Sequence, residues 1–465
     1  MTRHRVPVTG ELRAAGNLPF PSAAQHTQQP EETDVNVSAS GRGRPWRRAA
    51  LPAAALVALA ACAPSQSGST GGGAGAGGGG EKPSKVVVGS TLPLTGTESK
   101  TGGRYKQGYE LAVELENADG GLDIGGTKVP VELKLLDDTT NQGQAVQLAQ
   151  RLITQDKVNA FLGTYTTALV EAQSNVAQQT SIPYVNGGGA ATSIYSKGNP
   201  WIFSTLAPVE NLATTEMQWI EQQQEAGKLP KPAKIAILWE NTSHGQDFKK
   251  GIENFVAKQP GDYQVVVNES FALDGKDYSP LLSKVQASGA DLFMADAHLP
   301  DFITMHRQYV GSGLCNKLIT YGARGSEADA ISQLGEKNTN YILSAVWWNA
   351  QLGDEGLNKS FSEAFQKKFG ATPEWQHAVA YEAARTLFTA IDQADSVDKT
   401  KVRDTLRGLQ IDSILPGGKL DFPDNGQALY PFVVQQNLPG GKAPIIFPDD
   451  VKTADGVAPN PNCKG

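Results

Sequence analysis

Cysteine, histidine and positive charge are all scarce in this chain of 465 residues. It contains three cysteines and six histidines, and its formal net charge is −7. Three cysteines are too few for a disulfide scaffold, and no Cys-x-x-Cys or Cys/His cluster indicates zinc. We therefore expect no metal site and no cofactor. The acidic balance argues against nucleic acid as a partner.

Long hydrophobic runs are also missing. The run at residues 49–61 has 13 residues, which is too short for the ~20 that a membrane-spanning helix needs. It follows basic residues in RGRPWRRAALPAAALVALAAC and ends on Cys62, which is typical of a secretory signal. The LAAC segment resembles a lipobox, so we expect cleavage before Cys62, a lipid anchor on that cysteine, and an extracytoplasmic protein.

The segments on either side of this signal have unusual compositions. The first forty residues are polar and rich in Gln and Pro, which suggests an internal start at Val35 or Val37. We assign residues 1–61 to the leader and signal peptide. Residues 62–84 contain nine glycines and read as a flexible tether, with a reach of roughly 25 Å.

From residue 85 onward, short apolar runs alternate with stretches of helical periodicity. Two such series follow each other, and 39% hydrophobic residues are enough to fill two cores. This alternation predicts an α/β fold of two lobes, each a parallel sheet covered by helices. Ligands of such sheets bind beyond the carboxyl ends of the strands.

The stretch VNGGGAAT, residues 185–192, exposes bare backbone after a predicted strand. A phosphate-binding loop needs a Lys that is absent here, and the match to GxGxxG is loose. A linker is not expected inside a packed lobe. We therefore interpret the glycines as a loop that presents backbone N–H groups to a ligand, since glycine permits close approach.

A second candidate is GTYTTALVEAQ, residues 163–173. A strand is predicted to end near Tyr165 and a helix to start near Ala168. Thr166 and Thr167 then lie at the helix N-terminus, where backbone N–H groups and the helix dipole favour an anion.

Over most of its folded part the chain resembles the type I periplasmic binding proteins of the branched-chain amino-acid and amide family. The resemblance is carried by VVVGSTLPLTG, DDTTNQGQAVQLAQRLI, FLGTYTTALVEAQSNVAQQTSIPYVNGGGA and KIAILWENTSHGQDFKKGIENF. It implies a Venus-flytrap fold with three hinge crossings, near residues 204–208, 345–349 and 430–433. Lobe 1 is then residues 85–205 plus 348–430, and lobe 2 is residues 206–347 plus 431–465.

The resemblance also implies ligand contacts. Thr167 and the backbone of Gly188, Gly189 and Ala190 match positions that hold a ligand carboxylate, with Tyr165 and Thr166 beside them. The aromatic and acidic positions that hold an amino acid in this family fall here on other residue types, namely Thr101, His244, His298 and Ala323 or Arg324.

These departures change the expected ligand. Arg324 repels an ammonium group, and nothing replaces the missing acid unless Asp296 or Glu327 turns inward. We interpret Glu327 as part of a helix start that Ser326 caps. Arg324 with two histidines suits a second carboxylate, a carbonyl or another oxygen-rich group, which makes branched-chain amino acids less favoured.

Aromatic and amide side chains complete the predicted site. Trp347 and Trp348 end a strand at a predicted crossing, where one of them is available for stacking on a ligand. Gln376 falls where relatives line the side-chain pocket, with Trp375 beside it.

Together these features predict a lipid-anchored, monomeric receptor that delivers a small carboxylate-bearing ligand to an ABC import permease. The alternative is a ligand sensor that acts through a partner protein. We do not expect an enzyme, because there is no nucleophile elbow and no HExxH motif. With Cys62 lipidated, Cys315 and Cys463 remain as a pair, and we expect a disulfide between them in an oxidising compartment.

Overall fold

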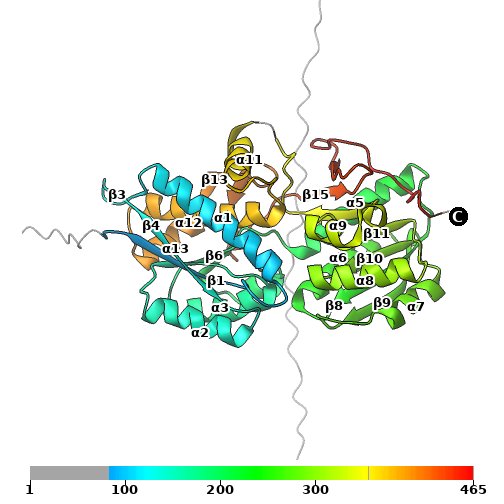
Figure 1. Ribbon diagram of the computed structural model, residues 1–465, viewed down its shortest axis with the longest axis horizontal. Coiled ribbons are helices and arrows are strands. Elements are labelled where there is room, and N and C mark those ends of the chain that lie inside the picture. The colour runs from blue at the N-terminus through cyan, green and yellow to red at the C-terminus, as the bar shows by residue number, and fades with distance from the viewer. Residues whose placement is uncertain (1–82, 354, 464–465) are drawn as a thin grey trace, which may run out of the picture. The chain divides into compact units, whose positions relative to one another are not determined.

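The computed structural model describes residues 83–353 and 355–463. The predicted signal peptide, the lipobox with Cys62, the internal start and almost all of the tether lie outside these residues. Within the described part, no helix has both the length and the apolar character needed to cross a bilayer. Two lobes make up this part of the chain, each built on its own sheet (Figure 1).

The sheet of lobe 1 has five parallel strands in the order β4-β1-β5-β6-β7. All seven residues of β1 are buried, as expected for a central parallel strand. The strands are β1 (Val86–Leu92), β4 (Val131–Asp137), β5 (Ala160–Leu162), β6 (Tyr184–Asn186) and β7 (Ile202–Ser204). The helices between them are α1 (Ser99–Ala118), α2 (Gln142–Thr154), α3 (Thr167–Thr180) and α4 (Thr192–Tyr195).

The sheet of lobe 2 has seven strands in the order β16-β15-β12-β11-β10-β8-β9. The first five along the chain are parallel, β15 runs antiparallel to its neighbour β12, and β16 at the edge runs antiparallel to β15. The strands are β8 (Ala233–Glu240), β9 (Tyr263–Phe271), β10 (Leu292–Asp296), β11 (Leu318–Thr320), β12 (Ile342–Val346), β15 (Val433–Gln436) and β16 (Ile445–Phe447). The helices are α5 (Val209–Glu225), α6 (Ser243–Ala257), α7 (Ser279–Ser288), α8 (Leu299–Gly311), α9 (Ala328–Leu334) and α10 (Glu336–Thr339).

The chain returns from lobe 2 to lobe 1 and then back again. After β12 it forms α11 (Gly356–Phe369), α12 (Trp375–Ala394) and α13 (Lys399–Arg407), and α12 packs on α1 and β6 of lobe 1. Figure 1 shows these orange elements beside the blue and cyan ones, whereas the red β15 joins the green and yellow lobe. Two small hairpins complete the described elements, β2 (Leu122–Asp123) with β3 (Lys128–Val129) and β13 (Gln410–Asp412) with β14 (Lys419–Asp421).

A disulfide attaches the C-terminal tail to lobe 2. Cys315 precedes β11 and bonds to Cys463, with 5.3 Å between the Cα atoms and a sequence separation of 148. Beside it, the backbone N–H of Asn460 donates to the Lys317 carbonyl at 2.8 Å. The tail, which has little regular structure of its own, is thereby held at one defined place on its lobe.

Candidate functional site

The two sheets bring chemically active side chains to equivalent places. In lobe 1 the first strand, β1, lies between β4 and β5, and in lobe 2 the first strand, β8, lies between β9 and β10. Each is a point where the strand order reverses, and ligands of α/β sheets bind at the carboxyl ends of strands there. Glu98 and Tyr165 follow β1 and β5, while Glu240 and Asp296 end β8 and β10. We call the contact zone of these loops the interlobe site.

Arg324 occupies the centre of the interlobe site. Its guanidinium donates to Glu327 Oε1 at 3.0 Å and to the hydroxyl of Tyr165 in the other lobe. It also lies over the rings of Trp375 and Tyr165, 4.8 and 5.4 Å from their centroids. Burial lowers the pKa of Arg324, but Tyr165, Glu327 and Glu98 together raise it well above its ordinary value. The residue is therefore a permanent buried cation.

Glu327 holds two guanidinium groups at once. Its side chain is only 1% exposed, and it accepts hydrogen bonds from Arg104 at 2.6 Å and from Gln376 at 2.8 Å as well as from Arg324. Glu327 does lie at a helix start, as predicted, but the predicted capping by Ser326 is wrong. Helix α9 begins at Ala328 with Glu327 at the N-cap, and no side chain caps it. The ion pairs of Glu327 with two buried arginines are stronger than its weak attraction to the helix dipole.

Sequence reasoning missed Arg104, which lies on the buried face of α1. Besides Glu327, it pairs with Asp329 at 2.8 Å and with Glu374 at 3.1 Å. Burial raises the pKa of Glu374 to about 7, although Arg104 opposes this shift. The sequence around Arg104, TGGRY, shows only an arginine among small and aromatic residues. An arginine in a helix is ordinarily interpreted as part of a solvent-exposed face.

His298 bridges the lobes between two carboxylates. Its Nδ1 is 3.0 Å from Glu98 Oε1 of lobe 1, and its Nε2 is 3.5 Å from Glu240 Oε2. Burial lowers the pKa of His298, but Glu240 and Glu98 together raise it to about 10. Burial raises the pKa of Glu98, but His298, Arg324 and Thr101 together lower it below its ordinary value. Thr101, in the first turn of α1, donates its hydroxyl to Glu98 at 3.3 Å.

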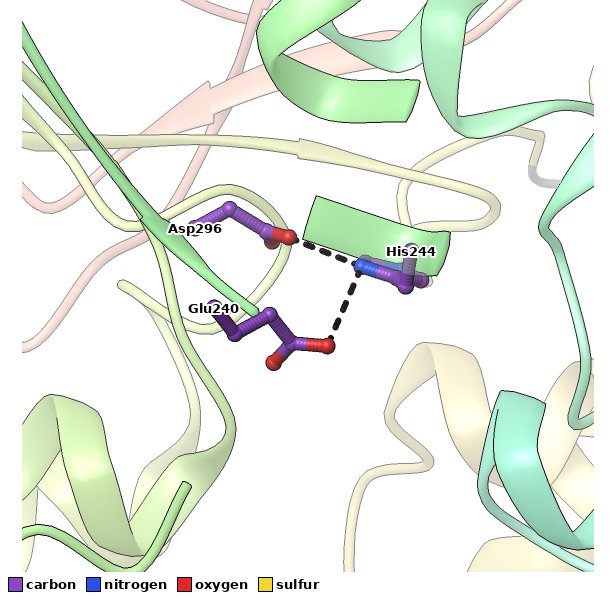
Figure 2. A group of neighbouring side chains, drawn as sticks. All are labelled: Glu240, His244 and Asp296. Atoms are coloured by element: carbon purple, nitrogen blue, oxygen red, sulfur yellow. Dashed lines mark hydrogen bonds and ion pairs between the residues drawn. The ribbon is translucent and has the colours of Figure 1, made fainter. Parts of the chain in front are cut away.

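His244 lies against two acids of its own lobe. Its Nδ1 is 2.8 Å from Asp296 and 3.9 Å from Glu240 (Figure 2). Burial lowers the pKa of His244, but Asp296 and Glu240 together raise it above its ordinary value. Asp296 and Glu327 thus both turn into the interlobe site. The site therefore contains the two acids that the sequence analysis named as possible replacements for the missing acidic residue. Because Glu327 lies against Arg324, the predicted repulsion of an ammonium group is weaker than the sequence alone indicates.

The glycine loop after β6 differs from its predicted role. The backbone N–H groups of Gly188 and Gly189 donate to Asn186 Oδ1 at 3.3 and 3.1 Å, and Tyr105 donates its hydroxyl to the Gly187 carbonyl. A Cβ on Gly188 would lie 1.9 Å from the Thr164 carbonyl oxygen. Close packing against β5 therefore requires glycine here, and Asn186 already occupies two of the expected donors.

The carbonyl of Ala190 accepts from Gln427, so the loop is fixed on that side as well. Helix α3 begins at Thr167 with Thr166 at its N-cap, close to the prediction, and Thr166 makes no side-chain capping bond. Both threonines are buried next to Tyr165, the residue that reaches Arg324.

The two tryptophans have different neighbours. Trp347 donates its indole N–H to the Ala207 carbonyl at 2.9 Å and packs between Trp375 and Phe432. The structure does not favour stacking of Trp347 on a ligand, because Trp375 and Phe432 already pack against its ring and the side chain is buried. Trp348 instead lines a cavity of about 200 Å³, together with Glu327, Glu374 and Trp375 from both lobes.

Two polar atoms near this cavity are buried without a hydrogen-bond partner in the described part of the chain. They are Trp375 Nε1 and Gln376 Oε1. Gln376 uses its amide nitrogen on Glu327. A donor and an acceptor are therefore left over beside Arg324, in a place where a polar ligand can satisfy them.

Two sheet lobes whose switch-point loops meet around buried charges define a two-lobed solute-binding protein. The chain belongs to the periplasmic binding protein family, whose model matches residues 85–442. It is 28% identical over 381 residues to a Leu/Ile/Val-binding protein homolog of Brucella abortus, a match that covers 79% of this chain and 92% of the relative.

Solved structures share the fold. A leucine-binding protein of Thermotoga maritima superposes with a TM-score of 0.69 at 21% identity, covering 78% of this chain and 99% of that protein. A solute-binding protein of R. palustris in complex with benzoate superposes with a TM-score of 0.66 at 19% identity, covering 80% and 98%. At these identities the likeness supports the fold and leaves the ligand open.

Proposed function

We propose that this protein captures a small carboxylate-bearing solute between its two lobes and delivers it to an ABC import permease. The observation that carries the proposal is Arg324, a buried guanidinium of lobe 2 that contacts Tyr165 of lobe 1. A ligand carboxylate that replaces the Tyr165 hydroxyl gains a charge-assisted, bidentate partner.

The surroundings of Arg324 narrow the ligand class. The rings of Trp375 and Tyr165 both lie next to the guanidinium, while Trp375 Nε1 and Gln376 Oε1 offer one donor and one acceptor. Glu98, on the lobe 1 side of the site, supplies negative charge for an amine. Amino acids and aromatic or polar organic acids both meet these conditions, which agrees with relatives named for Leu/Ile/Val and with a structural neighbour that holds benzoate.

A thermal-shift screen tests the proposal, since a ligand that binds the native state raises stability by mass action. The panel pairs each acid with its uncharged amide: leucine, glutamate, benzoate and succinate with their amides. We expect at least one acid to raise the melting temperature while its amide does not. Arg324→Gln should abolish that shift, whereas Arg403→Gln should keep it, because Arg403 lies over Trp201 in lobe 1. Equal shifts for acid and amide would rule out carboxylate recognition.

We further propose that the protein acts outside the cytoplasm, tethered to the membrane by a lipid on Cys62. The support is the signal-like sequence before Cys62 and the glycine-rich stretch after it. Expression of the full chain with Cys62→Ala should move the protein from the membrane fraction to the soluble extracytoplasmic fraction. Membrane association that persists in this variant would contradict a lipid anchor.

A further inference from the structure

Glu240, His244 and Asp296 bring three metal-ligating groups together in lobe 2. Their ligand atoms all lie within 4.8 Å of one another. Glu240 and Asp296 end the neighbouring parallel strands β8 and β10, and His244 lies in the first turn of α6, four residues after Glu240. Figure 2 shows the three side chains converging from these elements. The group is built from secondary structure and is largely buried, with the His244 side chain 13% exposed.

One oxygen of this group lacks a hydrogen bond. Glu240 Oε1 accepts from Thr242 at 2.6 Å, but Glu240 Oε2 is buried without a hydrogen-bond partner in the described part of the chain. Leaving a buried carboxylate oxygen unpaired is costly. The ion pair of this oxygen with His298 is 3.5 Å long and does not form a hydrogen bond, so a cation bound here would give Glu240 Oε2 a closer partner.

A second histidine lies next to the unpaired oxygen. His298 Nε2 is 3.5 Å from Glu240 Oε2, and His298 Nδ1 is 3.0 Å from the Glu98 carboxylate. Metal-binding histidines commonly hold the metal through one ring nitrogen and donate the other N–H to a carboxylate. His298 is already arranged in this way, with Glu98 as the outer carboxylate.

We propose that Glu240, His244, Asp296 and His298 form a binding site for one divalent transition-metal ion of the zinc type. Two imidazoles and two carboxylates suit Zn²⁺ or a similar ion, whereas Mg²⁺ and Ca²⁺ prefer oxygen ligands alone. With both histidines neutral, the two acids carry two negative charges, which the ion balances. Donor atoms of a tetrahedral Zn²⁺ site are about 3.4 Å apart. The separations here are 2.8 Å from His244 to Asp296, 3.9 Å from His244 to Glu240 and 3.5 Å from His298 to Glu240.

The site was not apparent from the sequence, because it contains no Cys and its ligands come from two separate segments, residues 240–244 and 296–298. The proposal goes beyond solute capture and does not rest on it. It also links the ion to the contact between lobes, since the four ligands belong to lobe 2 and Glu98 belongs to lobe 1. The bound ion should therefore stabilise the arrangement in which Glu98 holds His298.

The test is a titration of the chelator-treated, tag-free protein with ZnCl₂ by calorimetry, with Co²⁺ absorption as a second readout. We expect one ion per chain and a tetrahedral Co²⁺ spectrum. His244→Gln and Glu240→Gln should each weaken binding by more than tenfold. Glu98→Gln leaves all four ligands in place and should weaken it by about 10- to 100-fold. His377→Gln is the matched control, because His377 is a buried histidine of α12 whose Nδ1 accepts from the Glu374 backbone N–H and whose Nε2 contacts Gln107.

Failure to bind Zn²⁺ or Co²⁺ in the wild-type protein overturns the proposal. So does binding that is unchanged by His244→Gln, Glu240→Gln and Glu98→Gln, since the ion then lies elsewhere. Circular dichroism of each variant separates loss of the site from loss of the fold, and the wild-type titration decides if a variant does not fold. Running the acid and amide panel on the same metal-free protein keeps a failure of metal binding separate from a failure of solute capture.

Discussion

At the scale of single residues, the interlobe site depends on how buried charges are shared. Glu327 accepts from both Arg104 and Arg324, so one carboxylate balances two guanidiniums that have little access to water. Asp329 and Glu374 share Arg104 and are more exposed. Removing the central acid therefore leaves cations that solvent cannot easily stabilise.

Glu327→Gln tests this sharing. The amide keeps the shape but not the charge, and we expect it to lower the free energy of unfolding by about 3 kcal/mol. Glu114→Gln is the control, because Glu114 pairs with Lys368 at the surface and its side chain is 59% exposed. The control should change the free energy by less than about 0.5 kcal/mol in urea unfolding. Equal effects of the two variants would contradict a special role for Glu327.

The buried Glu216 in α5 should make the stability of the protein depend on pH. Its Oε1 accepts from the Thr320 hydroxyl and the Ala345 N–H, while Oε2 is buried without a hydrogen-bond partner in the described residues. Burial raises the pKa of Glu216 to about 8. Between its unfolded pKa of about 4.3 and this value, the native state binds the extra proton, so stability falls as the pH rises.

Chemical unfolding at pH 5 and pH 8 measures this effect. The wild-type protein should lose more stability over that interval than Glu216→Gln, whose amide cannot titrate. Identical losses in the two proteins would show that Glu216 titrates in its ordinary range.

At the scale of elements, the glycine loop after β6 shows why a motif can be located but misread. VNGGGAAT predicts a loop at the end of a strand, and the loop is there. What the sequence cannot show is that Asn186 folds back onto two of the amides, or that Thr164, just after the neighbouring strand β5, comes so near. Both facts depend on side-chain direction and strand spacing, which no local pattern encodes.

Substitution of two glycines separates the packing role from the general cost of losing glycine. Gly188→Ala places a Cβ 1.9 Å from the Thr164 oxygen and should destabilise the protein by about 3 kcal/mol. Gly103→Ala lies in α1, where a Cβ meets nothing within 4 Å, and should be neutral or stabilising by up to about 1 kcal/mol. A mild effect of Gly188→Ala in thermal unfolding would mean that the loop relaxes easily.

Local sequence patterns also predicted only part of the rest of the site. Apolar runs alternating with helical periods correctly indicated two α/β lobes, and the family resemblance pointed to Tyr165, His244, His298 and Arg324. The structure brings these residues into one zone. Arg104, Glu98 and Glu240 were missed because each is an ordinary residue until the partner lobe or strand lies against it.

At the scale of the whole molecule, the disulfide closes a loop with a sequence separation of 148 residues. A double substitution, Cys315→Ser with Cys463→Ser, frees the tail and should lower the free energy of unfolding by about 2 to 5 kcal/mol. Neither cysteine belongs to the interlobe site, so the affinity for the acid found in the screen should remain within about twofold. A large loss of affinity, measured by calorimetry, would mean that the tail shapes the site.

The central claim is that the two lobes enclose the solute. Contacts between the lobes include Arg324 with Tyr165, His298 with Glu98, and Asp247 with the Thr192 N–H at 2.7 Å. A solute held by both lobes favours the closed arrangement over an open one. Small-angle X-ray scattering of the protein with and without the acid found in the screen measures this directly. We predict that saturating acid lowers the radius of gyration, whereas an unchanged radius at saturation would contradict enclosure by the lobes.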